Sequence, residues 1–302
     1  MKRIDQLNNN ELDRNQSKTN QEILRILDPK IIIKKLKENS QYLPSAEEIK
    51  YAFENCTNPY QEWDAFIHEN KNKVYEIITQ EYLSDLANYL VEKYKEDKKI
   101  KILEVGAGNG KLTHHLRNYL KKQEAEKFEI VATDSGEWGI ETIYEVEQIE
   151  IEEAIKKHKP NVIICSWMPL NEDFTEIFRK YENIIEYLLI GDPDVCGDQW
   201  KTYGNKPYYL DEEYSSEFEY EDEEGWYYDN YYGLDEDEDE DEENIKNQGT
   251  QINNTEQEEE QQIPYEREGF ECQELRFENQ ICRSDYPGNY SHSKTLSFTK
   301  KQ

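Results

Sequence analysis

Positive charge is scarce in this sequence. Its 36 lysines and arginines stand against 67 aspartates and glutamates, which gives a formal net charge of −31. The excess is concentrated between Asp211 and Gln262, where 23 acidic residues accompany one basic residue, Lys246. Binding nucleic acid without a partner requires a basic face that neutralises phosphates, so the composition disfavours that function.

Paired cysteines and long apolar runs are also absent from the sequence. The five cysteines include no C-x-x-C spacing, which predicts neither a zinc site nor a disulfide framework, and no other metal constellation stands out. A reducing intracellular compartment, cytoplasm or nucleus, fits this usage. The N-terminus lacks a signal-peptide core, and the longest apolar-rich run, residues 161–170, is shorter than the ~20 residues of a membrane span. We therefore expect a soluble protein without a membrane partner.

The chain divides into five parts by composition. Residues 1–20 are polar and rich in Asn and Gln, which predicts disorder. Residues 21–95 are expected to form a helical extension, with a break at Asp28-Pro29 and a capping-box spacing between Ser45 and Glu48. Apolar residues then recur at helical intervals from Phe66 through 74–78 to Tyr94. This stripe is read as core packing, with a lid or substrate-contacting role as the alternative.

Residues 96–210 alternate between strand-like and helix-like segments. Apolar runs predict strands at 99–108, 128–134, 161–167 and 184–192, with a short strand near 144–149, and amphipathic segments separate them. Strands rich in Val, Ile and Leu without polar alternation are typical of a parallel sheet that is buried on both faces. We therefore expect an α/β fold with an open, Rossmann-like, doubly wound sheet.

Residues 211–262 interrupt this core, and residues 263–302 complete it. The acidic stretch combines repelling carboxylates with several tyrosines, which predicts either a disordered surface insertion or a docking segment for a basic protein partner. After it, residues 276–285 and 293–301 are read as two strands joined by a turn around Pro287-Gly288-Asn289. A hairpin that closes the sheet is the resulting expectation.

A glycine-rich loop follows the first strand of the core. Glu104, Gly106, Gly108 and Gly110 form the pattern E-x-G-x-G-x-G, whose glycines permit positive φ and bring a ligand close to the main chain. The spacing is neither that of a phosphate-binding P-loop nor that of the dinucleotide fingerprint. A second strand that ends in Asp134 completes a pattern that resembles class I S-adenosylmethionine-dependent methyltransferases.

The resemblance implies a seven-stranded sheet whose last strand is antiparallel, and S-adenosylmethionine as cofactor. It implies that the glycine loop and Glu104 face the methionine part, that Asp134 accepts hydrogen bonds from the ribose diol, and that one of Glu147, Glu150 and Glu152 contacts adenine, with Glu150 favoured. The implied cofactor-binding set is Glu104, Gly106, Ala107, Gly108, Gly110, Asp134, Glu150 and Ser166. The segments ICSWMP, DFTEIFR, EYLLIGD, CGDQW and QICRSD further resemble a poorly characterised eukaryotic methyltransferase-like group.

In this family the acceptor meets the methyl group beyond the fourth strand, here at Ser166-Trp167-Met168-Pro169. Enzymes that methylate base amino groups often carry D/N-P-P-Y/F at this place, so SWMP disfavours that specificity. Trp167 is read either as a wall against a flat or cationic group or as packing against a helix. Candidate catalytic residues are Asp173, Asp192, Tyr203 and Trp167, with Asp194 nearby; Asp192 and Asp194 also fit a simple turn. His114 and His115 fit surface or helix-packing roles, and Cys165 a buried side chain.

Two functions from different classes follow. The first is an S-adenosylmethionine-dependent methyltransferase that acts on a protein or a small molecule; the substrate itself is not identified. The second is an inactive methyltransferase-like scaffold that binds basic partners through residues 211–262. A nicotinamide oxidoreductase is a third and minor alternative.

Overall fold

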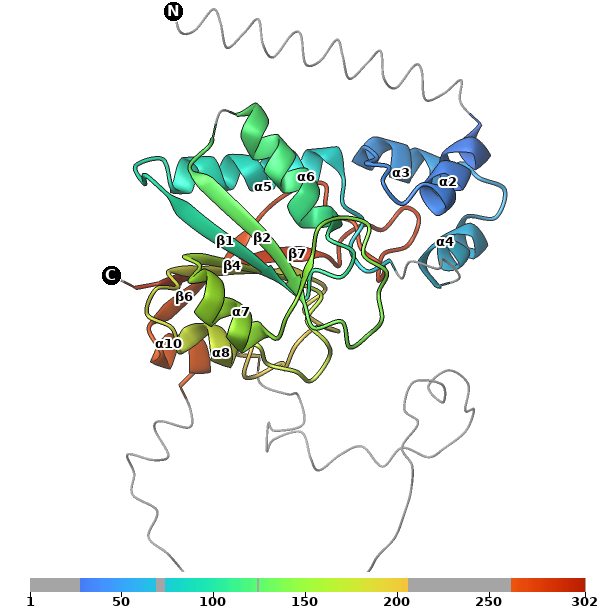
Figure 1. Cartoon of the computed structure of the whole chain (residues 1–302). Coiled ribbons are helices and arrows are strands. Elements are labelled where there is room, and N and C mark those ends of the chain that lie inside the picture. Colours follow the sequence, from blue (N-terminus) through green and yellow to red (C-terminus); the bar gives the residue numbers. More distant parts are fainter. Residues whose placement is uncertain (1–27, 69–73, 124, 206–261, 302) are drawn as a thin grey trace, which may run out of the picture.

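The computed structural model describes residues 28–68, 74–123, 125–205 and 262–301 (Figure 1). The segments expected to be disordered, 1–20 and all of 211–262 except its last residue, lie outside these ranges. So does the part of the predicted N-terminal helix before residue 28. None of the helices in the described ranges is long and apolar enough to span a bilayer.

A seven-stranded sheet forms the centre of the fold, in the order β3-β2-β1-β4-β5-β7-β6. β1 to β5 are parallel, and β7 is antiparallel to both β5 and β6. The strands are β1 (Ile100–Val105), β2 (Phe128–Asp134), β3 (Glu147–Gln148), β4 (Val162–Ser166), β5 (Glu186–Gly191), β6 (Phe270–Leu275) and β7 (Lys294–Lys300). This confirms the expected α/β fold, with seven strands of which the last in the chain is antiparallel.

Helices cover both faces of the sheet (Figure 1). One face carries α5 (Gln80–Lys93) and α6 (Lys111–Lys122), and the other carries α7 (Ile151–His158), α8 (Thr175–Arg179) and α10 (Pro264–Arg267). Alternate residues of β1 serve the two layers: Ile100 and Ile102 pack with α5 and α6, while Leu103 and Val105 pack with α7 and α8. Burial on both faces explains why the strands read as continuous apolar runs.

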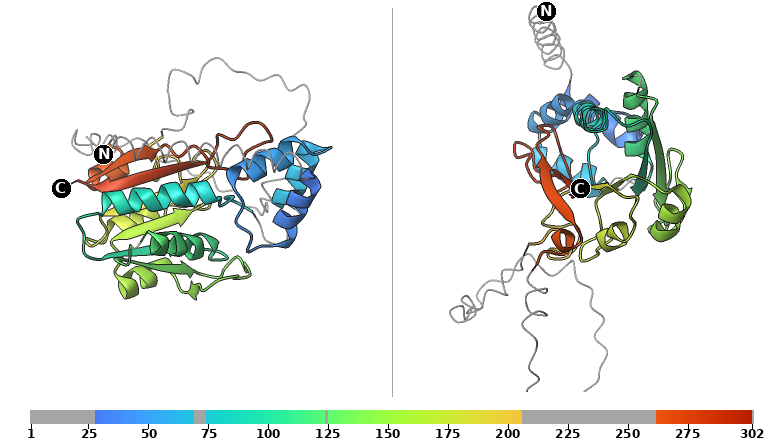
Figure 2. Two further views of the ribbon diagram at one scale, coloured as in Figure 1. Left: turned by 90° about the horizontal axis from the view of Figure 1, so that it is seen from above. Right: turned by 90° about the vertical axis from the view of Figure 1, so that its left-hand side faces the viewer.

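Three further helices form a separate packed unit at one end of the sheet (Figure 2). They are α2 (Pro29–Glu38), α3 (Ala46–Glu54) and α4 (Pro59–His68), and Phe53 is fully buried at their centre, against Trp63 and Phe66. The predicted capping box is present: the Glu48 amide donates to Ser45 Oγ at 3.1 Å, and the Ser45 amide donates to the Glu48 carboxylate at 2.8 Å.

Two segments fold differently from prediction. Residues 74–78 are extended instead of helical, and they pair with 281–283 through Ile77 N–H to Ile281 O and Arg283 N–H to Tyr75 O, both at 2.8 Å. The strand predicted over 276–285 is wrong, because β6 precedes it and 276–293 forms a long connection to β7. Only the end residues of β6, Phe270 and Leu275, are buried, so this edge strand has no clear two-residue period.

The long connection is held by a buried carboxylate. Asp285 is fully buried and accepts hydrogen bonds from the amides of Cys282, Ser291 and His292 at 2.7–3.0 Å. The nearby Ile281 is fully buried in the unit of α2, α3 and α4. Together with the pairing of 281–283 to 74–78, these contacts give residues 276–293 a defined path although they form no regular strand.

The two ends of the segment 206–261 meet on the body of the protein. A Cβ placed on Gly204 would lie 2.6 Å from Ile263 Cγ2, so the chain before the segment packs against the chain after it. Ile263 in turn packs against the core on the α7 and α8 face of the sheet.

A second buried carboxylate attaches α5 to the sheet. Glu186 on β5 is fully buried and accepts hydrogen bonds from Tyr89 at 2.5 Å, Lys93 at 2.7 Å and Ser297 at 2.5 Å, and another from Tyr94. A positive charge and three hydroxyl donors thus satisfy both oxygens.

Removing the Lys93 ammonium is expected to destabilise the fold, because Glu186 would remain a buried charge without a counter-ion. We expect Lys93→Ala to lower the free energy of unfolding by about 3 kcal/mol. The matched control is Lys95→Ala, whose ion pair with Glu92 is exposed and should contribute little to stability. Urea unfolding of both variants measures this, and equal losses would contradict it.

Candidate functional site

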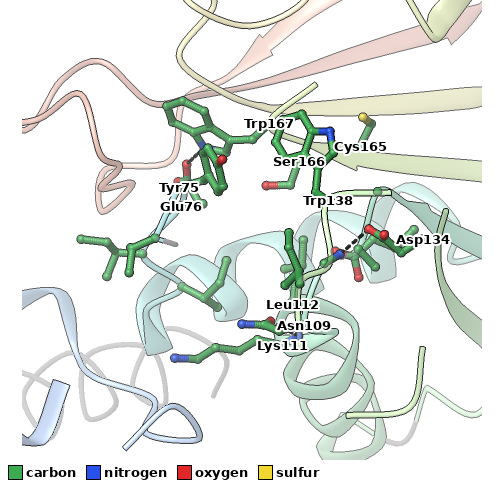
Figure 3. Close-up of a pocket in the computed structure, with 18 of the residues that line it drawn as sticks. Tyr75, Glu76, Asn109, Lys111, Leu112, Asp134, Trp138, Cys165, Ser166 and Trp167 are labelled. Carbon is green, nitrogen blue, oxygen red and sulfur yellow. Dashed lines mark hydrogen bonds between the residues drawn. The ribbon is translucent and has the colours of Figure 1, made fainter. Parts of the chain in front are cut away.

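A cavity of about 470 Å³ lies at the carboxyl ends of the parallel strands (Figure 3). Its walls come from the loop after β1, the ends of β2 and β4, the extended segment 74–78 and the unit of α2, α3 and α4. This volume falls within the range of sites for small ligands, and carboxyl strand ends are where open α/β sheets bind them.

Two glycines of the loop present main chain to the cavity. Gly106 and Gly108 both line it, with φ of +63° and +53°, a region that glycine adopts readily. No atom lies within 4 Å of a Cβ placed on Gly106, so the space beside it is open. The Gly108 amide instead donates to Asp134 Oδ2 at 2.8 Å. Ala107 also lines the cavity.

Gly110, a member of the predicted cofactor-binding set, is not among the residues that line the cavity. It precedes α6 with φ of +78°, and a Cβ there would lie 2.6 Å from Val146 Cγ2 and 3.3 Å from Tyr144 Cβ. The glycine at this position is therefore explained by close packing against residues 144–146.

Glu104 and Asp134 bring two carboxylates to the ends of neighbouring strands. Glu104 is buried and accepts from the Thr113 amide at 3.0 Å, and burial raises its pKa to about 7. Asp134 accepts from the Gly108 and Gly136 amides, one on each oxygen, at 2.8 Å. Each Asp134 oxygen keeps a second lone pair, so the carboxylate can still accept from a ligand.

Of the three glutamates considered for adenine, only Glu150 lines the cavity. It precedes α7, and its carboxylate makes no hydrogen bond or ion pair within the described residues. Glu147 contacts Lys157 and His158, and Glu152 pairs with Lys156 at 2.9 Å. Both are therefore engaged on the surface, away from the cavity.

The turn after β4 supplies Ser166 and Trp167, which both line the cavity. Trp167 has φ of +61°, unusual for a residue with a side chain, and its amide donates to Ile190 O at 2.8 Å. Its indole donates to Glu76 at 2.9 Å and lies 5.6 Å from the ring of Tyr75 (Figure 3). Trp167 thus packs against the extended segment 74–78 and also lines the cavity.

Three of the four candidate catalytic residues lie outside the cavity lining. Asp173 is a structural carboxylate: it accepts from the Thr175 amide at 3.1 Å and from the Thr202 hydroxyl at 3.1 Å, and it faces Arg179. Asp192 accepts from the Asp194 amide at 3.0 Å in a turn, as the alternative had it. Tyr203 packs into the core on the α7 and α8 face of the sheet.

The remaining sequence candidates have structural surroundings. His114 stacks on Tyr144 with ring centroids 3.8 Å apart, which agrees with a packing role. Cys165 is buried, and burial raises the pKa of its thiol, so it is a poor nucleophile. Within the described ranges, no group of three or more His, Cys, Asp and Glu side chains is placed to hold a metal ion.

Sequence reasoning missed Tyr75, Glu76 and Trp138, which line the cavity beside Trp167 (Figure 3). Glu76 accepts from Trp167 Nε1 and from Ser293 Oγ at 2.7 Å, and burial raises its pKa to about 8. The helical spacing read over residues 74–78 concealed these side chains. The signal that the sequence did offer was Trp138, a tryptophan in the loop that follows the strand ending at Asp134.

The cavity lining is predominantly acidic. It contains six carboxylates and two lysines: Glu76, Glu104, Asp134, Glu137, Glu150, Glu172, Lys37 and Lys111. Both lysines have partners, because Lys37 pairs with Glu62 at 2.9 Å and Lys111 donates to Tyr42 O at 2.7 Å. Burial lowers the pKa of Lys111 to about 8. The net field favours a positively charged ligand over an anionic one.

Comparison with known proteins gives similarity at the level of fold. No protein-family model and no curated protein matches the chain. Among solved structures, DszA carbon methyltransferase is 14% identical over 37% of this chain and 35% of that chain, with a TM-score of 0.27. CurJ carbon methyltransferase is 12% identical over 72% of this chain and 54% of that chain, with a TM-score of 0.33. A ribosomal protein L11 methylase from Lactobacillus delbrueckii subsp. bulgaricus is 12% identical over 73% of this chain and 78% of that chain, with a TM-score of 0.28. The chain thus spans about a third of the first and about half of the second.

Replacing Gly110 by alanine is expected to destabilise the protein more than the same change at Gly139. Both glycines have positive φ, +78° and +60°, so both variants carry backbone strain of about 1 kcal/mol. Only Gly110 adds a clash with Val146, which should bring the total to about 3 kcal/mol. Thermal unfolding of Gly110→Ala and Gly139→Ala tests this. Similar melting temperatures would show that residues 144–146 can move aside and accommodate the added Cβ at no cost in stability.

Proposed function

We propose that the protein is an S-adenosylmethionine-dependent methyltransferase. The observation that carries this proposal is the meeting of Glu104, Gly106 and Asp134 at one open cavity, at the carboxyl ends of the adjacent strands β1 and β2. The sheet around them has the seven strands that the resemblance implies, with the last strand, β7, antiparallel.

The lining suits each part of this cofactor. The open space beside Gly106 admits the amino-acid part, and the neighbouring Glu104 carboxylate suits its ammonium group. The free lone pairs of Asp134 suit a vicinal diol, which offers two donors. Glu150 has an unengaged carboxylate for the exocyclic amine of adenine. The acidic lining also suits the positive sulfonium, which would supply an electrophilic methyl group when the cofactor is bound.

The lining also argues against the alternatives with phosphate groups. A nicotinamide dinucleotide would place a pyrophosphate among six carboxylates, and both lysines of the lining are already engaged. A polynucleotide acceptor meets the same repulsion. We therefore propose a protein or small-molecule acceptor that enters beside Ser166 and Trp167, where β4 ends.

Calorimetry with S-adenosylmethionine tests the proposal. The wild-type protein should bind it, and Asp134→Asn should lower the affinity by about ten- to a hundredfold, because hydrogen bonds to a charged group contribute ~1.5–3 kcal/mol. Asparagine keeps one carbonyl oxygen for the loop amides, so the fold should persist. The matched control is Glu147→Gln, whose carboxylate lies outside the cavity lining and should leave binding unchanged.

An absence of binding by the folded wild-type protein would contradict the proposal and favour a scaffold without cofactor. Binding of NAD in place of S-adenosylmethionine would favour an oxidoreductase. If S-adenosylmethionine binds, incubation of the protein with methyl-labelled cofactor and cell extract would identify the class of acceptor from the labelled fraction.

A further inference from the structure

One wall of the cavity combines three aromatic rings with a carboxylate. Tyr75 is its centre: its ring centroid lies 5.6 Å from that of Trp167 and 6.3 Å from that of Trp138, with interplanar angles of 44° and 45°. Glu76 follows directly in the chain and is joined to Trp167 by a hydrogen bond (Figure 3). The rings belong to three segments far apart in sequence, which meet at the carboxyl end of β4.

The electrostatics of this wall suit a cation. Aromatic faces carry negative potential and attract ammonium groups within about 6 Å of the ring centroid. Tyr75 already shows this behaviour, because the guanidinium carbon of Arg283 lies 4.7 Å from its centroid. Arg283 is not part of the cavity lining, so its guanidinium does not occupy the space inside the cavity that the three rings border.

Glu76 is only partly neutralised by the protein. Its two oxygens accept from Trp167 Nε1 and Ser293 Oγ, both uncharged donors, and no ion pair with a lysine or arginine is present within the described ranges. Each oxygen keeps a lone pair, and Glu76 is a half-buried residue that lines the cavity. A positively charged ligand would therefore supply the counter-charge that this carboxylate lacks.

We propose that Tyr75, Glu76, Trp138 and Trp167 form a subsite for the cationic head of an organic amine. If the proposed methyl transfer is correct, on which this assignment of role rests, the amine is the acceptor. The Glu76 carboxylate then takes a proton from the ammonium group, which leaves the nitrogen with the free lone pair that an acceptor needs.

The charge state of Glu76 gives the subsite a pH dependence. The titratable groups that surround it are Tyr82 on α5, Asp192 and Cys196 after β5, and Cys282 and Asp285 in the connection 276–293. Burial raises the pKa of Glu76 to about 8, so its carboxylate is mostly protonated at pH 6.5 and mostly ionised at pH 9. Cation binding should therefore strengthen as the pH rises across this interval.

Choline is a suitable probe, because its quaternary ammonium does not titrate and any pH dependence must come from the protein. Its uncharged isostere, 3,3-dimethylbutan-1-ol, has the same shape. Tryptophan fluorescence titration at constant ionic strength should show saturable choline binding that strengthens about tenfold from pH 6.5 to pH 9. The alcohol should bind at least about tenfold more weakly at pH 9.

Glu76→Gln should remove most of the pH dependence, leaving only the part that Glu104 and Lys111 contribute from the same lining, and should weaken choline binding about tenfold at pH 9. The glutamine amide can still accept from Trp167 Nε1 and donate to Ser293 Oγ. Trp138→Leu changes a side chain that is 52% exposed, so the fold should tolerate it, and it should weaken binding about threefold. The control is Glu137→Gln, an exposed carboxylate of the same cavity, which should change affinity less than twofold.

Equal binding of choline and the alcohol would overturn the subsite, as would a pH dependence of choline binding in Glu76→Gln that is as large as in the wild-type protein. An effect of Glu137→Gln as large as that of Glu76→Gln would also overturn it, because the acidic field alone would then attract the cation. Titration of the same proteins with S-adenosylmethionine separates the two proposals. Cofactor binding without choline binding removes only the subsite, whereas choline binding without cofactor binding removes only the methyltransferase.

Discussion

Parallel pairing of β1, β2, β4 and β5 is the constraint on which the rest of the structure depends. It sends every crossover helix to a face of the sheet and brings all four carboxyl ends to one edge. Glu104, Asp134 and Ser166 occupy or immediately precede these ends, so residues up to 62 positions apart become neighbours around one cavity. The apolar sequence of the strands thereby determines where polar chemistry is concentrated.

The sequence predicted what depends on local periodicity and on strand ends. The parallel strands, α6 and α7, the short β3 and the capping box at Ser45 follow from such patterns, and the placement of Glu104 and Asp134 at strand ends was predictable from them. Prediction from the sequence failed where pairing between distant segments determines the backbone conformation. Residues 74–78 have helical spacing but pair with 281–283, about 200 positions away. Asp173 and Tyr203 looked available because their burial depends on tertiary contacts that spacing does not reveal.

Glu186 and Glu76 show two outcomes for a carboxylate inside the protein. Glu186 has an ammonium and three hydroxyl donors from α5 and β7, and it belongs to the scaffold. Glu76 has two uncharged donors and faces a cavity, and its pKa is raised because burial is not offset by a cation. A carboxylate whose charge is matched by a cation, such as Glu186, thus stabilises the fold. One without a cation, such as Glu76, remains available for a ligand.

The contact between Gly204 and Ile263 has a consequence for how this chain can change over time. Because Gly204 lies against Ile263, the sheet requires only that the stretch between them return to its starting point, and it sets no required length for that stretch. Selection on the composition of that stretch, including its acidity, is thereby separated from selection on the fold.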